Sequence, residues 1–400
     1  MTEKYNFDEI VSRRSTDSVK WDLAKDDVLP MWVADMDFKT APEITEAIVE
    51  KVSQGVFGYG LVPANFFDAI IHWWKETHQF NIKKEWILPG PGMIPTLSAI
   101  LRTFVKPEEN IIIQPPVYNH FYNFFENCEF GVVENNLIYN NGTYEIDFDD
   151  LEFKASDSKV KVLLLCNPHN PVGRVWKRNE LEKIAEICAK HKVMVVSDEI
   201  HADLVYEGHQ HIPFASVAEN YDLESVTCGS PCKTFNLAGL PISYVISQNV
   251  EILNKIHKTF EIQETSYPNP IAATALIAAY QNGNNWLDEL KIYLGENYQY
   301  LLEFIKENIP EIKVLPLEGT YLVWLDCHSL KKTSDDLSKI LLEEEKLWVN
   351  SGTMYGKAGE GFLRINIACT KANLADGLNR LKDFYQKIPK SHIASKDFTS

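Results

Sequence analysis

Short apolar runs alternate with amphipathic stretches along most of the chain. Residues 110–113, 161–166 and 193–197 are compact apolar runs, and such runs are typical of buried strands. Between the last two runs, residues 179–191 place apolar side chains at the spacing of one helix face. A strand, a helix and a further strand in this order predict a βαβ unit within a largely parallel sheet.

The same periodicities predict the remaining elements. We expect helices at residues 41–55, 66–79, 271–281, 286–308, 334–342 and 371–386. Further strands are expected at residues 223–227, 243–247, 320–326, 348–351 and 362–368, and a loose hairpin at 137–149. Residues 389–400 are polar and are expected to fray.

The length of the chain predicts more than one domain, because 400 residues exceed what one hydrophobic core normally serves. Beyond residue 308 the pattern changes to short strands between helices. We therefore predict a large domain at residues 46–285 and a small α+β domain at residues 286–400. An N-terminal arm, residues 1–45, is expected to join the small domain.

Composition narrows the classes of partner. The formal net charge of −17 disfavours binding to nucleic acid or to an anionic membrane surface. Seven scattered cysteines without a C-x-x-C pair indicate free thiols in a reducing compartment, with neither a disulfide framework nor a zinc site. Residues 1–18 lack the apolar run of a signal peptide, and no run is long enough to span a bilayer. A cytoplasmic protein is expected.

One lysine stands in an unusual setting. Lys233 lies in residues 228–240, read as Cys-Gly-Ser-Pro-Cys-Lys-Thr-Phe-Asn-Leu-Ala-Gly-Leu, where most neighbours are small or apolar. Partial burial would lower the pKa of its amine, and a neutral amine can form a Schiff base with a carbonyl compound. The ordinary alternative is a lysine on a surface loop. Asn170 and Asp198 also follow predicted strands, so all three are expected at the edge where open α/β sheets bind ligands.

Two other features could serve a ligand. Gly90 and Gly92 lead into a helix with Pro95 near its start, and the free N–H groups of a helix start suit a phosphate group. The alternative is a plain helix entry. Residues 29–38 are apolar but contain two aspartates beside Trp32, which indicates either a core strand or the edge of a cleft. Trp32, Trp73 and Trp74 are expected in the core, and Glu199 is expected to face away from the ligand.

Three motifs taken together resemble a known family. These are Asn-Pro-His-Asn-Pro-Val-Gly at residues 167–173, Ser-Asp-Glu-Ile-His at 197–201 and Ser-Pro-Cys-Lys-Thr-Phe at 230–235. They resemble the fold-type I pyridoxal-phosphate enzymes of the aspartate aminotransferase superfamily and, within it, the MalY/PatB group of cystathionine β-lyases. The resemblance covers residues 32–380. It implies an α/β fold with a mostly parallel seven-stranded sheet in the large domain.

The resemblance implies pyridoxal 5′-phosphate as cofactor and a role for each matching residue. Lys233 would form the Schiff base, Asp198 would pair with the ring nitrogen, Tyr118 would stack on the ring, and Asn170 would donate to its phenolate oxygen. The remaining cofactor neighbours would be Gly92, Met93, Ile94 and Ser230, which hold the phosphate, and His201. His201 could equally be a packing histidine.

Substrate binding and assembly are implied in the same way. Arg364 would grip the α-carboxylate of an amino-acid substrate, and Ala34 would offer its N–H to the same group. Tyr59 would reach the cofactor phosphate and the substrate of a neighbouring subunit, so the resemblance implies a homodimer with shared sites.

Departures from the aminotransferase pattern favour the lyase group. His201 stands where aminotransferases usually have tyrosine, and Pro241 stands where they usually have a phosphate-binding arginine. The expected reaction is an α,β-elimination that converts cystathionine or another cysteine S-conjugate into a thiol (homocysteine from cystathionine), pyruvate and ammonia. An aminotransferase is the alternative, and a regulator that binds a transcription factor is a third interpretation. The sequence gives no role for Cys232 or His120 and does not fix the preferred thioether.

Overall fold

A seven-stranded sheet forms the centre of the computed structural model, which describes residues 5–388. Residues 389–400, predicted to fray, and the first four residues of the predicted arm lie outside this range. The strand order is β2–β10–β9–β8–β7–β3–β4, with only β10 antiparallel to its neighbours. The bounds are β2 (Ile87–Gly90), β3 (Asn110–Ile113), β4 (Gly131–Glu134), β7 (Val160–Cys166), β8 (Met194–Asp198), β9 (Ser225–Gly229) and β10 (Ser243–Ile246). The predicted, mostly parallel seven-stranded sheet is confirmed.

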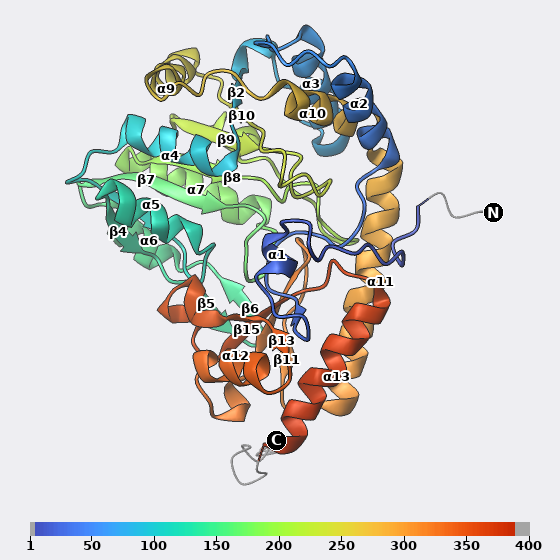
Figure 1. Cartoon of the computed structure of the whole chain (residues 1–400). Coiled ribbons are helices and arrows are strands. Elements are labelled where there is room, and N and C mark those ends of the chain that lie inside the picture. The colour runs from blue at the N-terminus through green and yellow to red at the C-terminus, as the bar shows by residue number, and fades with distance from the viewer. Residues whose placement is uncertain (1–4, 389–400) are drawn as a thin grey trace.

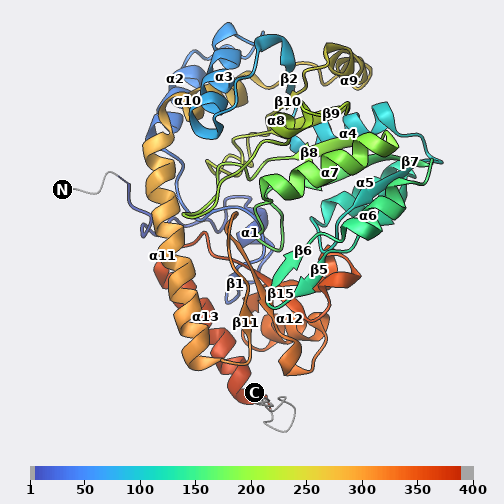
Figure 2. The same cartoon turned by 180° about the vertical axis from the view of Figure 1, so that it is seen from behind.

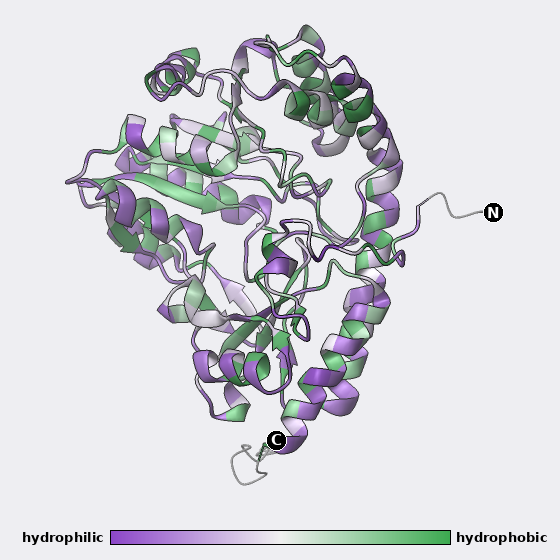
Figure 3. Ribbon diagram, in the orientation of Figure 1, coloured by the Kyte–Doolittle hydropathy of each residue, from purple (hydrophilic) through white to green (hydrophobic). Residues whose placement is uncertain are grey.

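Helices cover both faces of this sheet (Figures 1 and 2). On one face lie α4 (Met93–Phe104), α5 (His120–Cys128) and α9 (Val250–Ile262), and on the other α6 (Phe148–Ala155), α7 (Arg178–His191) and α8 (Phe214–Ala218). Successive side chains of β8 point to opposite faces of the sheet. Val196 packs against the face covered by α4, α5 and α9, and Val195 packs against the face covered by α6, α7 and α8. Figure 3, coloured by hydropathy, shows largely hydrophobic strands in the central sheet and helices of mixed hydrophobic and hydrophilic character around it.

The sequence prediction missed several of these elements. The aromatic-rich α5 has no side-chain cap, and the short β2 and β4 carry little pattern of their own. α9 did carry a readable signal, because Asn249 caps it and Ile252, Ile256 and Phe260 lie buried along one face. The predicted hairpin exists as β5 (Ile138–Asn140) and β6 (Thr143–Glu145), but its expected end at residue 149 already belongs to α6.

A helical layer packs beyond the β2 edge of the sheet. It consists of α2 (Pro42–Ser53), α3 (Ala64–His78) and the alanine-rich α10 (Pro270–Asn282). Trp73 and Trp74 are buried here as expected, and the ring of Trp73 stacks on Tyr280 with centroids 4.8 Å apart. Trp32 is different, because it is only half-buried and stacks on Trp348 at 4.3 Å. Its expected place in the core is therefore wrong.

A second, antiparallel sheet lies below the first in Figure 1, with the order β11–β12–β15–β14. Its strands are β11 (Lys313–Val314), β12 (Leu322–Asp326), β14 (Asn350–Ser351) and β15 (Phe362–Asn366), accompanied by α12 (Ser334–Glu343) and α13 (Lys371–Lys387). The long α11 (Asn284–Asn308) runs beside both sheets. The proposed domain limits at residues 45 and 285 remain a prediction.

The N-terminal part of the chain returns to this second sheet. After α1 (Val19–Asp22), the strand β1 (Leu29–Pro30) pairs in parallel with β13 (Leu347–Trp348). The single strand predicted at residues 348–351 is thus divided between β13 and β14, because its two ends pair with different partners. Single 3₁₀ turns occur at Lys84–Trp86, His328–Leu330, Gly352–Tyr355 and Lys357–Gly359. Within residues 5–388, no helix has the length and apolar character needed to cross a bilayer.

Candidate active site

A cavity of about 200 Å³ lies where the parallel strands end. Cys166 and Asp198 are the last residues of β7 and β8, and both line it. Ten of the predicted site residues line this one cavity: Ala34, Gly92, Met93, Ile94, Tyr118, Asn170, Asp198, His201, Ser230 and Lys233. The parallel register of neighbouring strands explains why loops so distant in sequence meet here.

The amine of Lys233 points across the cavity to the N-terminal segment. Its Nζ donates a hydrogen bond to the carbonyl oxygen of Ala34 at 2.6 Å. Burial lowers the pKa of Lys233, and the positive charge of Arg364 lowers it further, while Cys232 and Asp35 oppose the shift. The amine is therefore easier to deprotonate than an ordinary lysine, as the setting of residues 228–240 predicted.

Asp198 presents a carboxyl group with few partners. Its Oδ1 accepts a hydrogen bond from the N–H of Ile200 at 3.2 Å, and the side chain is otherwise enclosed. Burial raises the pKa of Asp198 to about 7, and the nearby charge of Glu199 adds to the effect. A carboxyl group in this state favours a ligand that brings a cationic N–H.

Glu199 faces the other side of the strand end, as expected. Its carboxylate accepts hydrogen bonds from the hydroxyl of Ser197 at 2.8 Å and from the N–H of Phe214 at 2.9 Å. Its second oxygen lies 2.8 Å from Nε2 of His211. None of these partners lines the cavity, and together they fix the side chain of Glu199 away from it.

Arg364 reaches the site from β15 of the second sheet. Its Nη1 donates to Oδ1 of Asn170 at 3.1 Å and its Nη2 donates to the carbonyl oxygen of Trp32 at 2.7 Å. The guanidinium lies over the ring of Tyr355, 4.9 Å from the centroid. Its buried Nε has no hydrogen-bond partner among residues 5–388, so an acceptor is missing on this side of the group. The bond to Oδ1 orients Asn170 so that its amide nitrogen remains as a donor.

The start of α4 forms a second part of the cavity wall. Gly92 has φ 131° and ψ 157°, a conformation open almost only to glycine, and no side chain caps the helix within the described chain. The N–H groups of the first turn are therefore available to an anion. Pro241 covers this turn, since a Cβ atom built on Gly92 would lie 3.0 Å from its Cβ. The hydroxyl of Ser230 donates to the carbonyl oxygen of Ile242 at 2.7 Å, so it would have to rotate to donate to a ligand.

Tyr118 and His201 add aromatic walls. Tyr118 is half-buried and packs edge-on against Phe121, with centroids 5.7 Å apart, and burial raises the pKa of its hydroxyl. Burial lowers the pKa of His201 to about 3, assisted by the charges of Lys233 and Arg364, so the imidazole is neutral near pH 7. Its Nδ1 is buried and has no partner in the described part of the protein.

Tyr59 does not reach this cavity. Its side chain is fully exposed, in a stretch where Val56, Phe57 and Leu61 are also more than 70% exposed. The cavity is lined without it, so any contact between Tyr59 and a cofactor would have to be made in another copy of the chain.

Several residues of the site were not predicted from the sequence. The hydroxyl of Tyr321 donates to the carbonyl oxygen of Ala34 at 3.0 Å, the same atom that accepts from Lys233. An aromatic residue beside a buried strand looks like core, so no sequence signal distinguished it. The residues that line the cavity and were not predicted are Pro95, Cys166, Ile200, Cys232, Ala238 and Pro241. Cys232, which had no predicted role, is buried, and its thiol lies 3.7 Å from two carbonyl oxygens, as expected for a residue that only packs.

Comparison with known proteins places the chain in a family. The sequence profile of class I and II aminotransferases matches residues 26–381. The chain belongs to this family. Within the family, it is 41% identical to cystathionine β-lyase PatB of Bacillus subtilis, over 94% of this chain and 99% of that protein. An aspartate aminotransferase of a Bacillus species is 26% identical, over 90% of this chain and 91% of that protein.

Solved structures of the family agree with the fold. A pyridoxal-phosphate-bound protein from Clostridium difficile, described as a putative aminotransferase, aligns with a TM-score of 0.92 at 38% identity, over 95% of this chain and 100% of the other. A pyridoxal-phosphate-bound C–S lyase from Staphylococcus hominis aligns with a TM-score of 0.90 at 32% identity, over 96% and 99%. The aminotransferase-like fold predicted from the sequence is thus confirmed.

Proposed function

We propose that this chain is a pyridoxal-phosphate-dependent carbon–sulfur lyase that cleaves cystathionine or a related cysteine S-conjugate by α,β-elimination. The products would be a thiol, pyruvate and ammonia. The observation that carries the proposal is the amine of Lys233, with a lowered pKa, in the same cavity as the buried carboxyl group of Asp198. The names of PatB and of the Staphylococcus C–S lyase support this chemistry.

The residues of the cavity fit pyridoxal phosphate in three respects. The carboxyl group of Asp198, with its raised pKa, would be satisfied by a protonated ring nitrogen. The uncapped start of α4 at Gly92 suits a phosphate group. The buried Nδ1 of His201 and the amide nitrogen of Asn170 leave polar groups that a ring oxygen could satisfy. When bound, the cofactor supplies an aldehyde that joins amines and a ring that withdraws electrons from Cα of the substrate.

Lys233 would act as the base. Its amine takes the proton from Cα of the substrate, and the thiolate then leaves from Cβ with the electron pair of the carbon–sulfur bond. Burial favours the neutral form of the amine that this step needs. The carbonyl oxygen of Ala34, 2.6 Å from Nζ, orients the amine when it is not bonded to the cofactor.

Arg364 would bind the α-carboxylate of the substrate. Its guanidinium is fixed by Asn170 and Trp32, and the unpartnered Nε still lacks an acceptor. A carboxylate accepts two parallel N–H groups from such a fork. The peptide N–H of Ala34, in the cavity wall, would be a further donor.

A homodimer would complete the site. An apolar rim is formed by the exposed side chains Val56, Phe57, Tyr59, Leu61 and Tyr267. Gly60 packs on Pro270, so the chain just after Tyr267 approaches this stretch. Large apolar side chains gathered at a surface usually meet a partner, and a second copy of the chain would place Tyr59 near the other copy's α4. A cytoplasmic location remains part of this proposal.

An aminotransferase is the second candidate, favoured by the description of the Clostridium protein. The lower identity to the aspartate aminotransferase, 26% against 41% to PatB, argues for the lyase. Pro241 at the phosphate-binding turn supports the same choice. The regulator hypothesis has weaker support, because a cavity with Lys233 and Asp198 in it points to chemistry.

The test uses the purified protein, cystathionine and no keto acid. We expect a yellow protein whose cofactor band is lost on borohydride reduction, and release of thiol and pyruvate in equal amounts. Lys233→Ala should lower this rate at least about a hundredfold, because it removes the general base. Lys258→Ala, at a well-exposed position, is the control and should act like the wild type. A strict requirement for a keto-acid acceptor would show that the protein is an aminotransferase.

A further inference from the structure

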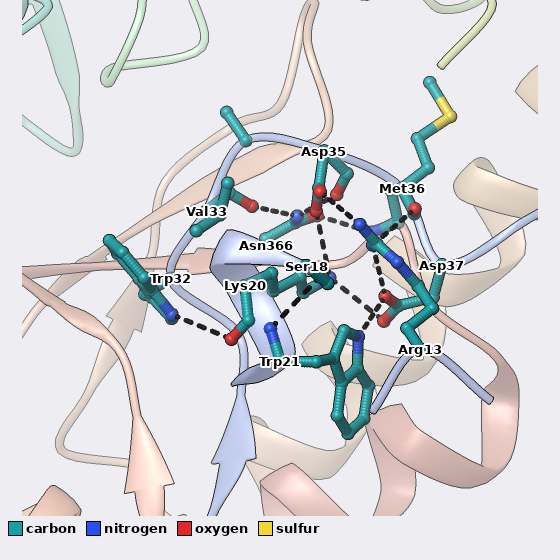
Figure 4. A network of polar contacts seen from close by, with 12 residues as sticks. Arg13, Ser18, Lys20, Trp21, Trp32, Val33, Asp35, Met36, Asp37 and Asn366 are labelled. Carbon is teal, nitrogen blue, oxygen red and sulfur yellow. Dashed lines mark hydrogen bonds and ion pairs between the residues drawn. The ribbon is translucent and has the colours of Figure 1, made fainter. Parts of the chain in front are cut away.

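Residues 32–37 contribute Ala34 to the wall of the cavity, and their backbone accepts hydrogen bonds from side chains of the site. The carbonyl oxygen of Ala34 accepts hydrogen bonds from Lys233 and Tyr321, and that of Trp32 accepts one from Arg364 at 2.7 Å. A small shift of this segment would therefore move several groups that face the ligand. The segment carries two aspartates, Asp35 and Asp37, whose carboxylates meet the side chains of Arg13 and Lys20 from earlier in the chain (Figure 4).

Arg13 and Lys20 form ion pairs with those two aspartates. Arg13 pairs with Asp35 at 2.7 Å and with Asp37 at 3.2 Å, and it also donates to the carbonyl oxygen of Met36 at 3.1 Å. Lys20 pairs with Asp37 at 2.9 Å and lies 3.7 Å from Asp35. Figure 4 shows the side chains of both cations beside the two carboxylates. The cluster is enclosed, since the side chain of Lys20 is 1% exposed and that of Asp37 is 6% exposed.

The charges of the cluster balance, with two cations for two carboxylates. Removing one cation would leave an uncompensated negative charge in a partly desolvated place, which is costly. Asp35 is directly bonded to Ala34 in the chain, and its charge already reaches the cavity, where it raises the pKa of Lys233 against the effect of burial. An unbalanced Asp35 would repel a carboxylate that binds beside Ala34.

We propose that Arg13 is a positioning residue for the carboxylate of the substrate: it holds residues 32–37 in place through Asp35 and cancels the charge of Asp35 beside the cavity. The proposal rests on the proposed function for the identity of the substrate. It adds a role for residues 13–20 of the N-terminal arm, none of which lines the cavity.

Arg14 provides a matched control. It is the next residue, its side chain is 27% exposed against 23% for Arg13, and it also belongs to the arm. Its guanidinium donates to the carbonyl oxygens of Trp21, Ala24, Lys25 and Val28, and among residues 5–388 it makes no hydrogen bond to residues 32–37. Loss of Arg14 should loosen the arm without changing the charge next to Ala34.

The kinetic experiment compares Arg13→Gln, Arg14→Gln and Asp35→Asn in the loaded enzyme with cystathionine. We expect Arg13→Gln to raise KM about tenfold, as one uncompensated charge near the site would, with kcat changed less than about threefold. Arg14→Gln should leave KM unchanged. Asp35→Asn removes the negative charge but keeps an acceptor for Arg13, so KM should fall or stay the same. The double variant Arg13→Gln/Asp35→Asn should return KM toward the wild-type value.

Binding of L-alanine, read from the absorbance of the cofactor, repeats the test without carbon–sulfur cleavage. We expect Arg13→Gln to bind L-alanine more weakly than the wild type, and Arg14→Gln and Asp35→Asn to bind it at least as tightly. If the wild type releases no thiol, the lyase proposal fails, but the L-alanine affinities still decide the role of Arg13. Equal effects of Arg13→Gln and Arg14→Gln, or Arg13→Gln with wild-type KM and wild-type L-alanine affinity, would overturn it. If Arg13→Gln does not fold, the L-alanine affinity of Asp35→Asn tests the proposal instead. An affinity equal to or tighter than that of the wild type supports the charge argument, and a weaker affinity contradicts it.

Discussion

Two buried aspartates separated by only five positions show how partners decide the state of a side chain. Burial raises the pKa of Asp198 to about 7, because one backbone N–H is its main hydrogen-bond donor. Burial also acts on Asp203, but hydrogen bonds from His78, Thr234 and Trp73 outweigh it and lower the pKa. The protein itself supplies the hydrogen-bond donors of Asp203, whereas Asp198 has room for a donor from a ligand. The residue that lacks partners is the one that faces the cavity.

This difference predicts a pH effect on the cofactor-free protein. The folded pKa of Asp198 lies above its ordinary value of 3.8, so the native state holds the proton more tightly than the unfolded state. The contribution of Asp198 to stability is therefore complete below about pH 4 and is lost as the pH rises through about 7. At pH 8 the loss of folding free energy reaches at most about 4 kcal/mol, as expected for a carboxyl pKa raised from 3.8 to about 7.

Urea unfolding at pH 5 and pH 8 tests this effect. The cofactor-free Asp198→Asn variant should be more stable than the wild type at pH 8, and the difference should shrink at pH 5. Asp203→Asn is the matched control and should be less stable than the wild type at pH 8, because it weakens the hydrogen bonds of an ionised carboxylate. A difference between Asp198→Asn and the wild type that does not change with pH would contradict the argument.

At the level of elements, the entrance to α4 shows why a glycine is needed. Gly92 adopts φ 131° and packs against Pro241, so a side chain would meet both backbone strain and a neighbour. This conformation of Gly92 lets the first turn of α4 line the cavity.

We expect Gly92→Ala to weaken cofactor binding about five- to a hundredfold, because such backbone strain costs roughly 1–3 kcal/mol. Gly295→Ala on α11 is the control, since it has a helical environment and open space around its Cβ position. It should keep the wild-type affinity and slightly raise the melting temperature. Equilibrium titration of the cofactor-free proteins with pyridoxal phosphate measures the affinities. An unchanged affinity of Gly92→Ala would argue against a phosphate site at this turn.

At the level of the whole molecule, the cavity belongs to two sheets and to the N-terminal segment at once. The hydrogen bond from Arg364 to Asn170 joins residues 194 positions apart, and that from Lys233 to Ala34 joins residues 199 apart. No single element contains the site. Its assembly depends on the approach of the second sheet to the strand ends of the first (Figures 1 and 2).

The proposed homodimer gives a test at this scale. Leu61→Glu places a charge in the apolar rim, where Leu61 is 85% exposed, and should dissociate the dimer because burying an unpaired charge is unfavourable. The monomer should also retain its cofactor less well, as Tyr59 would be withdrawn. Phe153→Glu, at a residue 76% exposed on α6, is the control and should remain dimeric. Sedimentation velocity distinguishes the two, and a wild-type protein that sediments as a monomer would refute the dimer.

The sequence by itself determined the core of the fold and most of the cavity. Strands β3, β7 and β8 are short apolar runs that need burial on both faces, and parallel neighbours end at the same edge. Residues that follow them in the chain, such as Asn170 and Asp198, must therefore lie close together. The motif at residues 230–235, which contains Lys233, then indicated Schiff-base chemistry with pyridoxal phosphate.

The tertiary structure alone decided the contacts between distant segments. No local pattern links Arg13 to Asp35, Tyr321 to Ala34 or Trp32 to Trp348, because each depends on how separate elements pack. The same is true of the raised pKa of Asp198, which depends on what surrounds the carboxyl group in space. Periodicity along a chain records which faces are buried, whereas the identity of the partner across that face is fixed only when the chain folds.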